Sequence, residues 1–121
     1  MRFPYKDDLP IVRVKVIGQI ETEVDAHIDF ASSLTILPGR MAEALGLKFA
    51  TFSSVATGGG IVVMPRYEAK LELLEKRFDL VIGCLELPAE TPISALLGRD
   101  VLDSFRVCLN GKRKEVEFTD A

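Results

Sequence analysis

The chain has 121 residues and a net charge of −3, and 48% of its residues are hydrophobic while 27% are charged. These values argue against a disordered chain and fit one globular domain, which we expect to span residues 1–121. No apolar run approaches the roughly 18–20 residues of a membrane span, so we expect no membrane partner. The chain is slightly acidic and has no long basic run, so we expect no nucleic-acid partner.

The cysteines, the single histidine and the N-terminal residues limit which metal chemistry and which cellular location can be expected. Cys84 and Cys108 lie in apolar, strand-like stretches, and buried free thiols are favoured over a disulfide. A single histidine, His27, and two distant cysteines give no metal-ligand spacing, so we expect no metal and no other cofactor. The first residues lack the apolar core of a signal peptide, which favours a cytoplasmic location.

The first part of the chain predicts strands followed by a short helix. Residues 11–16 alternate apolar and polar side chains, and residues 20–28 do so again, which indicates two strands. A loop begins at Asp29, and a short apolar strand is expected at 34–37. Residues 40–45 predict a helix that ends at Gly46.

The rest of the chain is dominated by β-prone runs. Three consecutive glycines, Gly58, Gly59 and Gly60, separate two such runs and predict a hairpin with a mobile tip. Asn110-Gly111 predicts a second hairpin turn. The remaining strands are expected at about 67–74, 77–84, 93–97, 105–109 and 115–118, with a loop at 86–92 and a short helix at 98–104.

Three segments together carry a family resemblance. Residues 28–38 read Ile-Asp-Phe-Ala-Ser-Ser-Leu-Thr-Ile-Leu-Pro, so one carboxylate ends an apolar strand and opens a loop of small residues. The glycine-rich hairpin at 55–64 follows, and then Ala-Leu-Leu-Gly-Arg-Asp-Val-Leu at 95–102. Over residues 11–118 this order resembles the retropepsin-like aspartic peptidases, the single-domain dimeric relatives of pepsin. The resemblance implies an all-β fold, a closed β-barrel of the acid protease type with one or two short helices.

The resemblance also implies a homodimer in which Asp29 and its symmetry mate meet at the twofold axis. Two carboxylates so close together cannot both ionise, so the pair shares one proton. The ionised carboxylate activates a water, and the protonated one polarises the scissile carbonyl. The implied function is therefore an aspartic endopeptidase that hydrolyses peptide bonds in extended peptide or protein substrates.

Further roles come from the same resemblance. Phe30 would lie at the dimer axis, and Arg99 would brace the loop that carries Asp29. We also expect the apolar chain ends to pair across the dimer interface, through Phe3, Tyr5, Val116 and Phe118. Substrate binding would fall to the loop and to the flap formed by the glycine-rich hairpin: Ala31, Ser32, Ser33, Gly58, Gly59 and Gly60.

Two departures from the family pattern leave a second function open. Phe30 stands where the family has threonine, so it lacks the hydroxyl that bonds across the dimer. Ala31 stands where the family has glycine, and its methyl lies where the substrate backbone would approach. The alternative is a catalytically impaired pseudopeptidase that acts as a dimeric peptide-binding or scaffold module.

Simpler interpretations of the same residues also remain. Asp29 can act as a turn residue that caps its own loop, and Arg99 with Asp100 can be an ordinary pair at a helix start. A serine hydrolase would need a base beside Ser32 or Ser33, and no nucleophile-elbow pattern surrounds the lone histidine.

Overall fold

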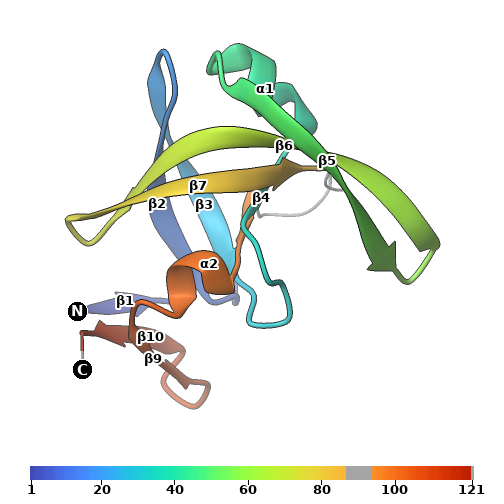
Figure 1. Cartoon of the computed structure of the whole chain (residues 1–121). Helices are drawn as coiled ribbons and strands as arrows, with labels where there is room; N and C mark the ends of the chain where they lie inside the picture. Colours follow the sequence, from blue (N-terminus) through green and yellow to red (C-terminus); the bar gives the residue numbers. More distant parts are fainter. Residues whose placement is uncertain (87–93, 121) are drawn as a thin grey trace.

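Strands dominate the computed structural model, which describes residues 1–86 and 94–120 (Figure 1). The expectation of an all-β chain with two short helices is confirmed. The helices are α1 (Gly39–Ala44) and α2 (Arg99–Leu102). The strands are β1 (Arg2–Pro4), β2 (Ile11–Ile17), β3 (Glu21–Ile28), β4 (Ile36–Leu37), β5 (Lys48–Thr57), β6 (Gly60–Leu73), β7 (Lys76–Cys84), β8 (Ala95–Leu97), β9 (Arg106–Asn110) and β10 (Glu115–Thr119).

Six strands close into a barrel in the order β2-β3-β8-β4-β7-β6, and the ring is completed by pairing between β2 and β6. The alternation seen in the sequence explains the closure. Val12, Val14 and Val16 of β2 are buried and share one face, whereas Arg13 on the other face is exposed. Closure pairs the edges of the sheet and leaves the alternating apolar side chains to fill the interior.

The short strands β4 and β8 are apolar on both faces. Leu37 and Leu97 belong to the barrel core, and both are fully buried. Ile36 and Leu96 are directly paired and lie on the opposite face, because successive side chains of a strand alternate. The sheet therefore presents a second apolar surface outside the core, and this surface underlies the candidate site.

The β5–β6 hairpin extends beyond the barrel (Figure 1), with pairing from Lys48–Glu68 to Thr57–Gly60. The sequence predicted the glycine-rich hairpin at 55–64 and a separate strand at 67–74, but β6 runs unbroken through Pro65. Pairing of β6 with β7 begins only at Arg66, so the missing N–H of Pro65 interrupts no bond to β7.

The chain ends form a separate three-stranded sheet in the order β1-β10-β9. Phe3 pairs with Val116 of the same chain, and the Phe3 and Phe118 rings meet edge to face at 6.0 Å. Val116 and Phe118 are buried in the chain's own core, so these two side chains are not available to pair across a dimer interface, contrary to expectation. Tyr5, the fourth of these residues, donates its N–H to the carbonyl of Lys114 within the chain.

The two thiols lie in different environments, and both are free. Cys84 is buried as expected, and burial together with the charge of Glu86 raises its pKa to about 11. Cys108 was expected to be buried but is exposed, because β9 is the edge strand of the small sheet and turns this side to solvent. Thiol chemistry is therefore available at Cys108 and suppressed at Cys84.

Several boundaries differ slightly from those predicted. Gly46 ends α1 with a positive φ of 64°, as expected for a glycine at that place. The last hairpin turns over residues 111–114 rather than at Asn110-Gly111 alone. The predicted loop at 86–92 falls, beyond Glu86, outside the described residues, as does Ile93 of the strand predicted at 93–97. In the described part of the chain, no helix has the length and apolar character needed to cross a membrane.

Candidate active site

Asp29 lies just after β3, at the start of a tight loop. Its N–H donates to the carbonyl of Leu97 at 3.0 Å, which continues the parallel pairing of β3 with β8 by one residue. Its Oδ1 accepts the N–H of Ala31 at 3.0 Å, a bond that closes an Asx turn. The turn reading of Asp29 is thus correct, and one carboxylate oxygen holds the loop while the residue also lines a cavity.

Helix α2 holds this loop from outside the barrel. The guanidinium of Arg99 donates to the carbonyl of Phe30 at 2.6 Å, and the N–H of Arg99 donates to the carbonyl of Ser32 at 2.9 Å. Arg99 therefore bonds to backbone carbonyls of the loop, and these bonds need no acidic side chain in the loop. The hydroxyl of Ser32 donates to the carbonyl of Leu34 at 2.6 Å, which constrains the turn further.

A buried threonine fixes the far end of the loop. Thr35 is 1% exposed, and its hydroxyl donates to Oδ1 of Asp100 at 2.8 Å while accepting the N–H of Gly98 at 3.2 Å. The N–H of Thr35 donates to Oδ2 of the same carboxylate at 2.9 Å. Bonds to an ionised acceptor are stronger than neutral ones, so Asp100 links the loop firmly to α2. The local sequence pattern does not indicate this role for Thr35 and Asp100, because the two residues lie 65 positions apart in the chain.

A cavity of about 530 Å³ opens between this loop and the β5–β6 hairpin. Its loop side consists of Asp29, Ala31, Ser32, Ser33 and Leu34, and its floor consists of Ile36, Leu96 and Met64. Among the described residues that line it, Asp29 is the one ionisable side chain. The cavity therefore has a single carboxylate, that of Asp29, beside an apolar floor, and the β5–β6 hairpin lines the side opposite the loop.

The structure separates the sequence-predicted site residues into two groups. Four of them, at positions 29 and 31–33, line the cavity. Gly58, Gly59 and Gly60 lie at the tip of the hairpin and do not line it, and the tip is a turn between Thr57 and Gly60. Phe30 also lies outside the lining, and its side chain is 42% exposed beside Asp29.

Sequence reasoning missed the strand residues that complete the cavity. Ser53, Ser54, Val55 and Ala56 line it from β5, and Met64 lines it from β6. One signal could have found part of this set. Ser53 pairs directly with Met64, and directly paired residues share a face, so a hairpin that turns at the glycines places these two side chains on the same side.

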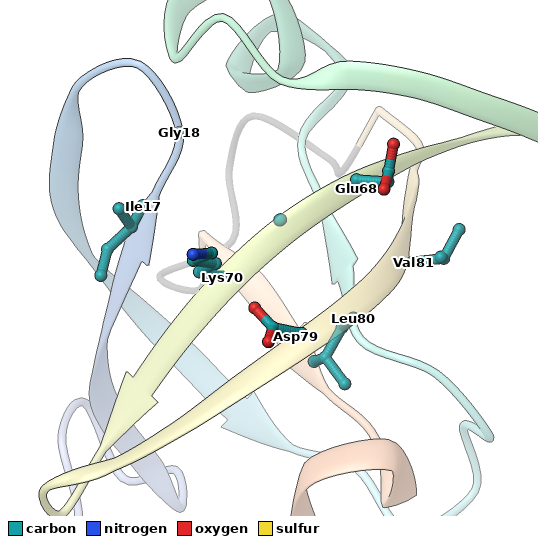
Figure 2. Close-up of a pocket in the computed structure, with 8 residues that line it drawn as sticks. Ile17, Gly18, Glu68, Lys70, Asp79, Leu80 and Val81 are labelled. Atoms are coloured by element: carbon teal, nitrogen blue, oxygen red, sulfur yellow. The ribbon is translucent and has the colours of Figure 1, made fainter.

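A second cavity, of about 590 Å³, lies elsewhere on the barrel, between the end of β2 and strands β6 and β7 (Figure 2). Figure 2 shows Lys70 and Asp79 beside each other there, and they are directly paired across the two strands. Both side chains are exposed to solvent, and none of the sequence-predicted site residues lines this cavity. The first cavity is therefore the candidate active site.

Comparison with known proteins finds similarity at the level of structure only. No protein-family profile matches the chain, and no curated protein sequence matches it. The EIAV protease, solved with the inhibitor HBY-793, superposes with a TM-score of 0.63 at 15% identity over 80% of this chain and 88% of that one.

Two cellular structures are similar to a comparable degree. A retropepsin-like aspartic protease from Rickettsia conorii gives a TM-score of 0.62 at 14% identity, over 98% of this chain and 88% of that one. The retroviral protease-like domain of Ddi1 from Leishmania major gives 0.54 at 18% identity, over 93% and 91%. At such identities the likeness concerns the fold, and the chain has the retropepsin-like fold.

Proposed function

We propose that the chain is an aspartic endopeptidase whose catalytic pair is formed by Asp29 and the Asp29 of a second copy. The observation that carries the proposal is the position of Asp29, the one ionisable group among the described residues around a cavity with an apolar floor in a retropepsin-like fold. A peptide bond is cleaved by adding water to its carbonyl, and a single carboxylate cannot both activate the water and protonate the carbonyl oxygen.

In the proposed dimer the two carboxylates share one proton. The ionised carboxylate removes a proton from the water as the oxygen attacks the carbonyl carbon, and the other carboxyl donates its proton to the carbonyl oxygen. The loop contacts support this role, because the Ala31 N–H bonds to the Asp29 carboxylate and Arg99 bonds to the Phe30 carbonyl, which together hold the loop that follows Asp29. A site that is held in place before the reaction lowers the cost of reorganisation during it.

The β5–β6 hairpin would serve as the flap. Its strand residues line the cavity opposite Asp29, so an extended peptide would lie between the loop and the hairpin. The glycine tip would then act by allowing the hairpin to move, and its role in substrate binding stays a prediction. Closure over a peptide would exclude bulk water from the reacting bond.

A second candidate function follows from Phe30. This ring is 42% exposed beside Asp29, and it has no hydroxyl with which to bond across a twofold axis. If the paired rings keep the two loops apart, the cleft would bind extended peptides without cleaving them. The chain would then be a dimeric peptide-binding or scaffold module.

Cleavage of a mixed-peptide pool between about pH 3 and pH 8 tests both functions, because a shared proton requires an acidic optimum. We expect wild-type activity that Asp29→Asn abolishes, since the amide removes the charge and the shared proton while keeping the shape. Asp79→Asn, an exposed carboxylate at the second cavity, is the matched control and should keep full activity.

The remaining outcomes of that assay are equally decisive. Activity confined to the double variant Phe30→Thr/Ala31→Gly would establish the catalytically impaired pseudopeptidase, with Phe30 and Ala31 as the cause of the lost activity. An unchanged rate in Asp29→Asn would refute the carboxylate mechanism, and silence in every variant would refute the endopeptidase.

The dimer has its own test at Phe30. Burying a phenylalanine side chain is worth about 1.5–3 kcal/mol, and this ring is already partly buried. Loss of two such rings should weaken the dimer at least about tenfold. Sedimentation should show wild type at twice the 13.3 kDa chain mass and Phe30→Ala shifted toward the monomer. Phe52→Ala, which removes a 63% exposed ring on the hairpin, is the control, and equal affinity in both variants would place the interface elsewhere.

A further inference from the structure

Met64 is an unusual residue of the β5–β6 hairpin, because it is fully buried while its neighbours are open to solvent. Its exposed fraction is 0%, whereas Val63 is 66% exposed. Met64 belongs to the cavity floor together with Ile36 and Leu96, and it lies outside the barrel core. A long apolar side chain on the hairpin thus reaches down to the sheet and forms part of the site.

The space that Met64 occupies exists because residue 83 is glycine. A Cβ built on Gly83 would overlap the Sδ and Cε atoms of Met64, and it would lie 3.0 Å from Cδ1 of Leu34. Gly83 does not have a positive φ, so its backbone would accept another residue. The glycine is therefore needed for space rather than for backbone conformation. Gly83 also pairs with Ile36, which places the end of Met64 beside the floor.

We propose that Met64, packed on Gly83, sets the depth of an aliphatic subsite in this cavity and so determines which peptide side chains it accepts. The inference rests on the proposed function, because it concerns the peptide that would lie in the same cleft. The floor residues Ile36, Leu96 and Met64 are apolar and offer no counter-charge, and burying an unpaired charge is unfavourable. We therefore expect an aliphatic substrate side chain on this floor, with a size limited by Met64.

The packing also explains why a normally adaptable side chain can discriminate by size. Methionine has three rotatable side-chain bonds and fills irregular spaces readily. Here the end of Met64 packs against the backbone of Gly83, with the end of Leu34 beside it, so movement of Met64 away from the cavity is restricted on that side. A larger substrate side chain would have to displace the thioether into filled space.

Two substitutions should move the specificity in opposite directions. Met64→Ala removes the Sδ and Cε atoms and deepens the subsite, whereas Gly83→Ala pushes the Met64 side chain into the cavity and makes it shallower. Met64→Leu conserves volume closely and is the matched control. Small changes of fit in an apolar pocket alter selectivity by about 10–200-fold, which sets the scale to expect.

The experiment measures equilibrium binding in the Asp29→Asn background, so that catalysis plays no part. The probes are otherwise identical eight-residue peptides with alanine, leucine or phenylalanine on both sides of the central bond. We expect the protein that carries only Asp29→Asn, with its cavity floor unchanged, to bind the leucine peptide most tightly of the three. Met64→Ala should raise the affinity ratio of the phenylalanine to the leucine peptide at least about tenfold. Gly83→Ala should shift the preference toward the alanine peptide, and Met64→Leu should leave both ratios within about threefold.

Urea unfolding of each variant identifies any that fails to fold, and Met64→Val then replaces Met64→Ala as the milder truncation. Peptide binding with unchanged ratios in both the Met64 truncation and Gly83→Ala would overturn the subsite while leaving the proposed function intact. Absence of binding to every probe by every folded variant would overturn the proposed function, and the subsite with it.

Discussion

The hydroxyl of Thr35 offers the sharpest test of how the loop that carries Asp29 is held. Thr35→Val replaces the hydroxyl with a methyl group of nearly the same size at a position that is 1% exposed. The variant loses the bond to Asp100 at 2.8 Å and leaves the buried N–H of Gly98 without its 3.2 Å acceptor. The perturbation is therefore confined to hydrogen bonding and leaves the packing unchanged.

The magnitude follows from the two groups involved. A hydrogen bond to a charged group contributes about 1.5–3 kcal/mol, and a buried donor left unsatisfied costs about 1–3 kcal/mol. The two effects share one hydroxyl and are not fully additive, so we expect a loss of about 2–4 kcal/mol in the free energy of unfolding. This is a large part of the roughly 5–15 kcal/mol that stabilises a typical domain.

Urea unfolding monitored by circular dichroism measures the effect, and the slope of the free energy with urea should stay constant because the surface exposed on unfolding does not change. Thr51→Val is the matched control. Its exposed hydroxyl makes a long 3.4 Å contact with a carbonyl, so its loss should change stability by at most about 0.5 kcal/mol. A Thr35→Val variant as stable as Thr51→Val would show that the link between the loop and α2 contributes nothing.

Three further outcomes follow from the structure. Gly98→Ala should destabilise the protein by more than about 2 kcal/mol, because the added Cβ would overlap the backbone carbonyl of Leu34. The control is Gly111→Ala, where a Cβ would meet nothing within 4 Å, and its stability should stay within about 0.5 kcal/mol of wild type. Equal urea midpoints for the two variants would contradict this prediction. The hydrogen bond from Lys6, with the charges of Lys6 and Arg13, holds the pKa of Asp25 below its usual 3.8, so its stabilising contribution is present above that pH and is lost as the pH falls through the lowered pKa. Asp25→Asn should thus cost about 0.5–1 kcal/mol at neutral pH and nothing in strong acid, and a deficit that persisted in acid would exclude the charge as its cause. A thiol reagent at pH 8 should modify Cys108 in the folded protein and reach Cys84 only after unfolding, because burial raises the pKa of Cys84 to about 11; mass spectrometry of the labelled peptides decides.

Local features of this protein could be predicted from its sequence because neighbouring residues encode them. The alternation at 11–16 and 20–28 predicted two strands, which are present at Ile11–Ile17 and Glu21–Ile28. Gly46 predicted the end of α1, since a positive φ there suits glycine. The loop at Asp29 was predicted in the same way, from an apolar strand, a carboxylate and small residues in succession.

Tertiary structure decided everything that depends on residues far apart in the chain. Thr35 bonds to Asp100 across 65 positions, and Arg99 reaches the carbonyl of Phe30 across 69, so no short pattern contains either contact. The burial of Phe118 beside Phe3 likewise required both chain ends to meet in one sheet. Met64 acquires its place in the cavity only when β6 and β7 bring it onto Gly83, because a side chain's role in a site is set by the space that distant residues leave for it.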